Sequence, residues 1–292
     1  MSFAIVTDTS ANLPCELIHR NNIHVIPFPY FVNGNERTCP NPAAFDGKHF
    51  YKMMRAGARV TTTLISPQKY IDTMQPLLEA DQDILYIGMS SGISGAYAAA
   101  LSAIEELREK YPSRQIAAVD SLGAALGEGL LVMKAIRCRQ TGDSIEQTLE
   151  ILLDYRMRIC QIFTVDDLSY LRRGGRISHL KAIAGTMLHV KPLLKASVVG
   201  KIENFAKVRG RKHALSALAE HYKKLVRDAA DQTVGITYAG CPEDAATLAD
   251  LIRKIAPPKE LLILPHEPMT GSHLGPGGLA LFFTGEHGIR TL

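Results

Sequence analysis

The segment Leu85–Tyr97, LYIGMSSGISGAY, constrains the fold more than any other stretch of the chain. It begins as an apolar run typical of a strand buried on both faces, breaks into a turn rich in serine and glycine, and continues as an alanine-rich helix. A buried strand that leads into a helix places this turn at the carboxyl end of a sheet. Serine hydroxyls and the unpaired N–H groups of the helix start meet there. We therefore expect the turn to bind an anionic group such as phosphate or carboxylate.

The alternation of strand and helix in this segment occurs four times in the first 160 or so residues. Such alternation predicts an α/β fold with a parallel, doubly wound sheet, whose ligand crevice lies beyond the carboxyl ends of the strands. Prolines inside Val25–Val32 place that strand at a sheet edge. Val60–Thr63 is expected to be a hydroxyl-rich loop. The polar side chains expected at the carboxyl edge are Asp8, Thr62, Ser91 and Asp120.

The pattern changes from Cys160 onward. Pro192–Val199 and Lys201–Val208 predict a β-hairpin around Gly200, which is typical of an antiparallel or mixed sheet. Ile177–Met187 is expected to be helical. We therefore predict two domains, an N-terminal α/β domain with a parallel sheet over residues 1–159 and a C-terminal α/β domain with a mixed sheet over residues 160–292.

Composition excludes several classes of protein. With 292 residues and 46% hydrophobic content the chain can bury a sizeable core, but it contains no apolar run of the roughly 18–20 residues that span a bilayer. Because MSFAIVTD enters a strand pattern without a basic leader, we expect a cytoplasmic protein without stable membrane insertion. The five cysteines lack CxxC spacing, so neither a disulfide framework nor a metal site is expected.

Basic residues are concentrated in one part of the chain. The net charge is only +4, yet the stretch from Arg172 to Lys212 contains a single acidic residue, Glu203. This stretch should form a positive surface that attracts an anionic ligand or an acidic protein partner. Because no nucleic-acid recognition motif accompanies the charge, we do not expect a nucleic-acid partner.

The serine turn has two chemical interpretations. Gly88–Gly92 fits the G-x-S-x-G nucleophile elbow, and His273 lies downstream, in a glycine-rich turn before the last strand, so a serine esterase or thioesterase using Ser90 or Ser91 is one hypothesis. The chain lacks an HGGG-type oxyanion run, a P-loop and a dinucleotide fingerprint. The other hypothesis is that Thr62 or Thr63, together with Ser91 and Ser94, holds a carboxylate through uncharged donors, although helix capping explains any single hydroxyl equally well.

Six motifs are distributed along the whole chain: Asp8–Pro14 (DTSANLP), Thr62–Pro67 (TTLISP), Ser90–Gly95 (SSGISG), Leu171–Ile177 (LRRGGRI), Lys191–Leu194 (KPLL) and His273–Gly277 (HLGPG). In content and order they resemble the motifs of the DegV family. The resemblance implies a bacterial fatty-acid-binding protein with two α/β domains and a buried acyl chain. It also implies a carrier that is not itself an enzyme, needs no cofactor, and passes its fatty acid to a separate ATP-dependent kinase subunit that makes the acyl phosphate.

The same resemblance implies roles for individual residues. The carboxylate would be held by Thr62, by Ser91 or Ser94, and by His273. This chain departs from the family pattern in Thr63-Leu64-Ile65 and at Leu274, which leaves its acyl preference open. Further contacts to the ligand or to the kinase are implied for Thr63, Gly92, Arg173, Arg176 and Arg209.

Overall fold

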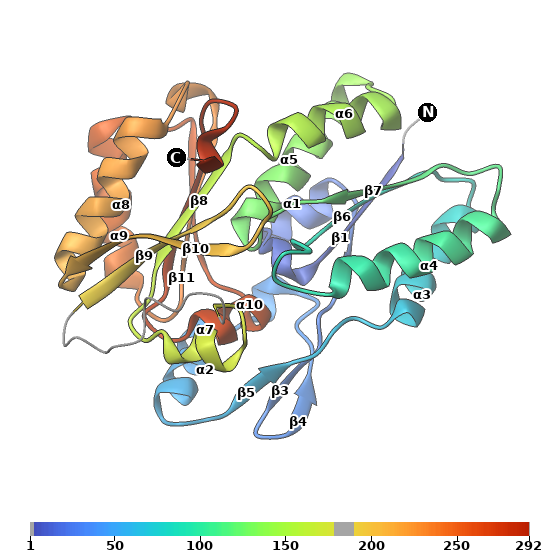
Figure 1. The fold of residues 1–292 in the computed structure, drawn as a ribbon. Coiled ribbons are helices and arrows are strands. Elements are labelled where there is room, and N and C mark those ends of the chain that lie inside the picture. Colours follow the sequence, from blue (N-terminus) through green and yellow to red (C-terminus); the bar gives the residue numbers. More distant parts are fainter. Residues whose placement is uncertain (1–2, 178–189, 292) are drawn as a thin grey trace.

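The computed structural model describes residues 3–177 and 190–291. A four-stranded parallel sheet forms the first half of the chain, in the strand order β2-β1-β6-β7 (Figure 1). Strand β6 is buried along its whole length, as the apolar run predicts. The edge position of β2 agrees with the prolines that follow it. The strands of this sheet are β1 (Ala4–Asp8), β2 (Ile23–Ile26), β6 (Ile84–Gly88) and β7 (Ile116–Asp120).

Helices cover both faces of this sheet because successive side chains of a strand point to opposite sides. Val6 and Tyr86 pack with α3 (Pro67–Glu79) and α4 (Ala96–Lys110), whereas Ile5 and Leu85 pack on the opposite face. The doubly wound arrangement is therefore confirmed. The helices of that opposite face are α1 (Cys15–Arg20), α5 (Leu126–Thr141) and α6 (Ile145–Tyr155).

A six-stranded mixed sheet forms the second half, in the order β10-β9-β8-β13-β11-β12. Strands β11 and β12 pair in parallel, whereas the other described pairs are antiparallel, so the predicted mixed sheet and the β9–β10 hairpin are confirmed. Its strands are β8 (Ile159–Thr164), β9 (Val190–Ala196), β10 (Ile202–Arg209), β11 (Thr233–Tyr238), β12 (Glu260–Pro265) and β13 (Leu279–Thr284).

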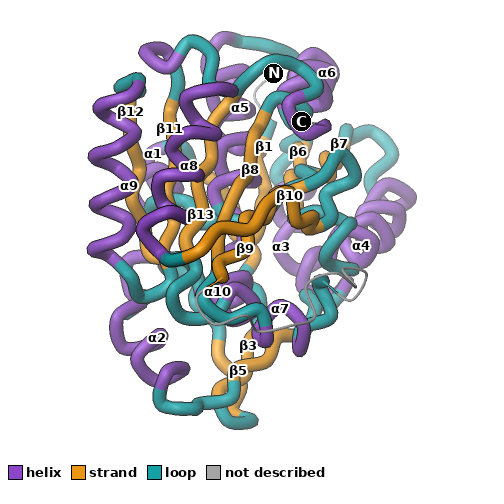
Figure 2. Tube along the Cα trace, turned by 60° about the vertical axis from the view of Figure 1, so that its left-hand side comes forward, coloured by secondary structure: helices purple, strands orange, loops and turns teal. Residues whose placement is uncertain are grey.

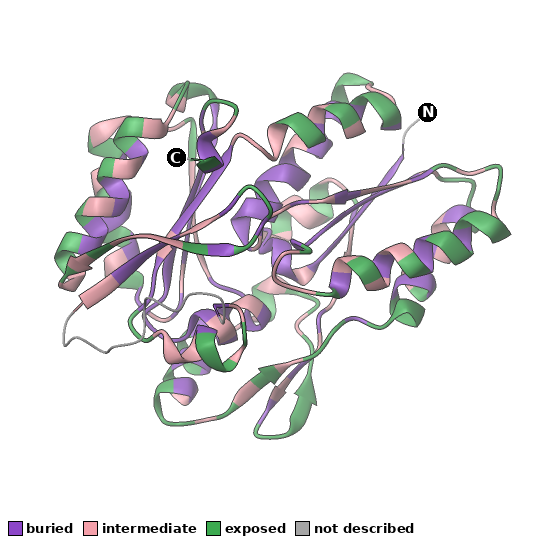
Figure 3. Cartoon of the chain, viewed as in Figure 1, coloured by how far each residue is buried: buried purple, intermediate pink, exposed green. Residues whose placement is uncertain are grey.

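Helix α5 lies between the two sheets. Its apolar side chains share one core with Ile5 and Leu85 of the first sheet and with Ala280 and Phe282 of the second. Helices α8 (Arg211–Leu225) and α9 (Pro242–Ile255) cover the outer face of the second sheet (Figure 2). Figure 3 shows the consequence, since the strands of both sheets are largely buried and exposed residues lie on the outward faces of the helices.

A small antiparallel sheet of order β4-β3-β5 projects from the first half of the chain. It corrects two predictions: Val25–Val32 is divided between β2 and β3, and Val60–Thr63 is mostly strand β5. The reason for the second is that β-branched Thr61 and Thr62 pair with Phe31 and Tyr30. The elements here are β3 (Tyr30–Val32), β4 (Asn35–Arg37), β5 (Val60–Thr62) and the neighbouring α2 (Gly47–Arg55).

A short helix, α10 (Pro268–Leu274), replaces the turn predicted around His273. The Glu267 side chain accepts hydrogen bonds from the N–H groups of Met269 and Thr270, both at 2.6 Å, and Pro268 occupies the first helical position. These capping signals outweigh the glycines that suggested a turn.

Another short helix, α7, spans Ser169–Arg173. The helix expected at Ile177–Met187 lies outside the described residues apart from Ile177, which is buried. Strands β1 to β7, which form the parallel sheet and the small antiparallel sheet, all end before residue 159. The six-stranded mixed sheet begins with β8 at Ile159. The domain boundary at 159/160 remains a prediction.

Candidate functional site

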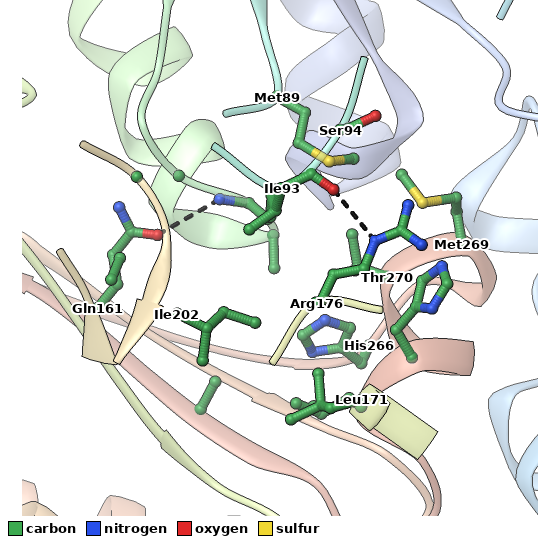
Figure 4. Close-up of a pocket in the computed structure, with 18 of the residues that line it drawn as sticks. Met89, Ile93, Ser94, Gln161, Leu171, Arg176, Ile202, His266, Met269 and Thr270 are labelled. Atoms are coloured by element: carbon green, nitrogen blue, oxygen red, sulfur yellow. Dashed lines mark hydrogen bonds between the residues drawn. The ribbon is translucent and has the colours of Figure 1, made fainter. Parts of the chain in front are cut away.

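A largely apolar pocket of about 320 Å³ lies between the two halves of the chain (Figure 4). Phe28, Met89 and Ile93 line it from the first half, and Phe163 and Phe282 line it from the second. Pockets of this kind, with an apolar wall and a few placed polar groups, are typical small-molecule sites.

Thr62 and His273 provide a polar pair in the pocket wall. Thr62 is the last residue of β5 and His273 lies in the last turn of α10, and their Oγ1 and Nε2 atoms are 2.8 Å apart. Burial, reinforced by the positive charge of Arg176, lowers the pKa of His273 to about 4. The imidazole is therefore neutral at pH 7, and the pair offers uncharged hydrogen-bonding groups.

The serine turn contributes one of its hydroxyls to the pocket. Ser94 lines the pocket, and its Oγ accepts a hydrogen bond from the Ala96 N–H at 3.2 Å, which leaves its own O–H able to donate to a ligand. Ser91 is exposed and lies outside the pocket lining. Its Oγ donates to Asp120 at 2.5 Å, and its N–H donates to the same carboxylate at 3.2 Å. The structure thus joins Ser91 to the carboxyl end of β7.

The hairpin turn between β9 and β10 packs against the serine turn. A Cβ atom on Gly92 would lie 2.5 Å from the carbonyl oxygen of Val199, so only glycine permits this approach. Ser90 is buried and donates from its Oγ to the carbonyl of Gly200 at 2.9 Å. Both Gly92 and Ser90 therefore join the two halves of the chain next to the pocket.

The three predicted arginines occupy different environments. Arg176 lines the pocket, its Nε donates to the carbonyl of Ile93 at 3.1 Å, and burial lowers its pKa. Arg173 is exposed, with its guanidinium 4.5 Å from the ring centroid of Tyr170, and Arg209 is exposed at the end of β10. The predicted residues that line the pocket are thus Thr62, Thr63, Ser94, Arg176 and His273, whereas Ser91, Gly92, Arg173 and Arg209 lie outside its lining.

The sequence reasoning did not assign two buried polar side chains to the pocket. Gln161 on β8 is 6% exposed, and its Oε1 accepts a hydrogen bond from the Ala124 N–H at 3.3 Å. His266 follows β12 and is 4% exposed, with Nδ1 2.7 Å from the Thr237 hydroxyl, and burial lowers its pKa to about 3. The sequence signal that could have identified them is a polar residue within, or directly after, a predicted apolar strand.

A buried acidic cluster lies beside α5. The Ser10 hydroxyl is 2.5 Å from both Asp8 Oδ1 and Glu128 Oε2. A hydroxyl carries one proton, so the second of these short contacts requires a proton on a carboxyl group. Burial, with a contribution from Asp8, raises the pKa of Glu128 well above its ordinary value, whereas burial raises that of Asp8 to about 6. Glu128 therefore donates to Ser10, which in turn donates to Asp8.

Within residues 3–177 and 190–291, no three His, Cys, Asp or Glu side chains are grouped so that they could hold a metal ion. Over the same residues no helix is both long and apolar enough to cross a bilayer.

The two sheets and the pocket between them define an α/β protein with a mostly apolar pocket that carries a neutral hydroxyl–imidazole pair. The profile described as "Uncharacterised protein, DegV family" matches residues 2–286. A DegV domain-containing protein of Clostridium perfringens is 36% identical over 284 residues, which cover 97% of this chain and 98% of the relative. The chain belongs to the DegV family.

Solved structures of relatives share the fold. A DegV family protein from Thermus thermophilus, described by its fatty acid binding, has a TM-score of 0.88 at 27% identity and covers 98% of this chain and 100% of its own. DegV of Bacillus subtilis, described as a fatty acid binding protein, has a TM-score of 0.84, also at 27% identity, with coverage of 98% and 100%.

Proposed function

We propose that this protein binds a long-chain fatty acid, with the carboxylate at Thr62, Ser94 and His273 and the acyl chain in the apolar pocket. The observation that carries the proposal is the Thr62–His273 pair, which places a hydroxyl and a neutral imidazole 2.8 Å apart in a mostly apolar wall. The relatives from Thermus thermophilus and Bacillus subtilis, both described as binding fatty acids, support it. In this proposal residues 160–292 form a domain that covers the acyl chain.

The physical properties of the pocket fit such a ligand. Burial of an acyl chain is worth roughly 0.8 kcal/mol per CH₂ group, so the apolar wall supplies most of the affinity and the polar groups fix the orientation. Thr62 and Ser94 donate without neutralising the carboxylate. Arg176, which also lines the pocket, adds a positive charge that attracts the head group.

We further propose that the protein presents the carboxylate to a separate ATP-dependent kinase subunit in the cytoplasm and does not catalyse the transfer itself. A carboxylate oxygen would attack the γ-phosphorus of ATP, giving the acyl phosphate and ADP, a reaction in which positioning of the carboxylate is central. Thr63 is exposed where it lines the pocket, so the polar end is accessible from outside. Exposed Arg173 and Arg209 are our candidates for contacts with the kinase.

Ser91 remains a candidate for a role in presentation. Its hydroxyl and N–H both bind Asp120, so any contact with the carboxylate requires the Asp120 hydrogen bonds to open. The esterase hypothesis gains no specific support. The Ser90 hydroxyl donates to Gly200, that of Ser91 donates to Asp120, and His273 pairs with Thr62.

Mass spectrometry of the protein purified from bacteria without delipidation tests the binding proposal. We expect about one fatty acid per chain under native conditions and its release on denaturation. An empty protein that hydrolyses acyl esters, with activity abolished by Ser90→Ala, would overturn the proposal.

An acyl-phosphate assay with the partner kinase tests presentation. Arg173→Glu and Arg209→Glu are expected to slow phosphorylation while the bound fatty acid remains. If a loaded carrier is not phosphorylated by any such kinase, the presentation proposal fails and the binding proposal stands.

A further inference from the structure

The pocket contains a buried polar side chain that the proposed carboxylate site does not use. His266 lines the pocket, as Figure 4 shows, and is only 4% exposed. Gln161, the other strongly buried polar residue of the wall, has a partner for its amide oxygen in the Ala124 N–H at 3.3 Å. The two residues therefore differ in what they offer to a ligand.

Three hydrogen-bonding contacts hold His266 in place, one to its ring and two to its backbone. Its Nδ1 is 2.7 Å from the Thr237 hydroxyl, its carbonyl accepts from the Tyr51 hydroxyl at 2.6 Å, and its N–H donates to Tyr238 at 2.9 Å. None of the described residues forms a hydrogen bond with Nε2, the remaining polar atom of the ring. Burial keeps the imidazole neutral at pH 7.

His266 lies apart from the head-group end. It precedes α10, whereas His273 occupies the last turn of this helix. From Pro268 to His273 the helix advances by roughly 7–8 Å, at about 1.5 Å per residue, and His266 lies two residues before this helix, with Glu267 between them in extended conformation. A ligand whose carboxylate binds Thr62 and His273 would therefore pass His266 part-way along its acyl chain.

A plain alkyl chain at this position leaves the Nε2 atom without a hydrogen-bond partner, which carries a desolvation penalty. A hydroxyl both donates and accepts, so it satisfies Nε2 in either tautomer of the ring. We propose that the pocket selects a fatty acid that carries a hydroxyl group part-way along its chain, bound by Nε2 of His266. This inference rests on the proposed function, because it assumes that an acyl chain occupies the pocket.

A competition experiment on delipidated protein tests the inference, with stearic, 10-hydroxystearic and 12-hydroxystearic acids as ligands and native mass spectrometry as the readout. The unmodified protein is expected to bind at least one of the hydroxy acids about tenfold more tightly than stearic acid. His266→Leu should lose this preference and bind stearic acid at least as well as before. His49→Leu, which replaces an exposed histidine on α2, should keep the preference of the unmodified protein.

A spectroscopic measurement on the unmodified protein covers the case in which His266→Leu does not fold. The ¹⁵N resonance of His266 Nε2 should shift on addition of the preferred hydroxy acid and much less on addition of stearic acid. Equal affinity for all three acids, or a preference that survives His266→Leu, overturns the inference and leaves the proposed function standing. Failure of all three acids to bind overturns the proposed function as well.

Discussion

His273 packs directly against Gly174, so closely that a Cβ atom at position 174 would lie 2.4 Å from Nδ1 of the imidazole. The other ring nitrogen, Nε2, is the one that pairs with Thr62. The glycine that ends α7 therefore makes room for a site residue almost one hundred positions away in the chain. This contact explains in physical terms why a glycine is needed between the arginines of the LRRGGR segment.

Substitution of this glycine should disturb the site without direct contact with a ligand. Gly174→Ala is expected to displace the His273 ring from Thr62 and weaken fatty acid binding about tenfold, measured by calorimetry. The control is a double-mutant cycle with His273→Ala, in which Gly174→Ala should have little further effect because the ring is already absent. Equal losses in both backgrounds would show that Gly174 acts by another route.

Removal of the Thr62 hydroxyl tests the head-group site directly. Thr62→Val keeps the side-chain shape but leaves a carboxylate oxygen without a donor, which typically costs about 1–3 kcal/mol. Neighbouring Thr61 is exposed and outside the pocket lining, so Thr61→Val serves as the matched control and should bind as the unmodified protein does. Binding constants that are the same for both variants would remove Thr62 from the site.

The cap of α10 predicts a pH dependence of stability. Burial raises the pKa of Glu267 from 4.5 to about 7, so between these values the folded state keeps a proton that the unfolded state releases. The stabilisation is complete below about pH 4.5 and is lost as the pH rises through about 7. Asp8, with a pKa raised by burial, acts in the same direction, whereas the lowered pKa values of His266 and His273 oppose it below about pH 6.5.

Glu267→Gln isolates this contribution. We take the free energy of unfolding at pH 5 minus that at pH 8, both from denaturant unfolding. This signed value should be lower in Glu267→Gln than in the unmodified protein, by on the order of 2 kcal/mol. Glu105→Gln, which alters an exposed side chain on α4, should leave the difference unchanged. A pH response of Glu267→Gln that matches the unmodified protein contradicts the prediction.

The Ser10 hydroxyl is expected to be essential to the acidic cluster. Ser10→Ala brings two buried carboxyl groups together without a bridging donor and should destabilise the protein by about 1–3 kcal/mol. Glu128→Gln should cost less, because its amide can still donate to Ser10. Exposed Ser102, replaced by alanine, is the control in the same unfolding experiment. A stability of Ser10→Ala close to that of this control would contradict the proton arrangement that we describe.

Local patterns were sufficient for most of the secondary structure. The apolar run that begins the segment Leu85–Tyr97 and the hairpin around Gly200 were found in the sequence because burial and turn chemistry act over a few residues. The predicted secondary structure was wrong where a long-range contact or a helix cap decided which element formed. Val60–Thr62 is a strand only because β3 lies beside it, and α10 forms because Glu267 caps it.

The candidate site was partly predictable for the same reason. The motifs that resemble those of the DegV family pointed to Thr62, Ser94 and His273, which line the pocket. No spacing rule could reveal that Ser91 binds Asp120 and lies outside the pocket lining. Gln161 and His266 were not assigned to the pocket, because a single polar residue in or directly after a strand is usually a satisfied structural residue. Whether these two residues line the pocket depends on how the second sheet packs against the first half of the chain.

The sequence by itself determined the α/β class, the parallel and mixed sheets, and the serine turn at the end of β6, because these depend on periodicity and on local backbone preferences. Only the tertiary structure decided that the hydroxyl of Thr62 meets His273 across 211 positions. It also decided that His266 shares their pocket. Such pairs form when two sheets enclose α5 and bring distant segments together, and the packing energy that drives this is spread over the whole core.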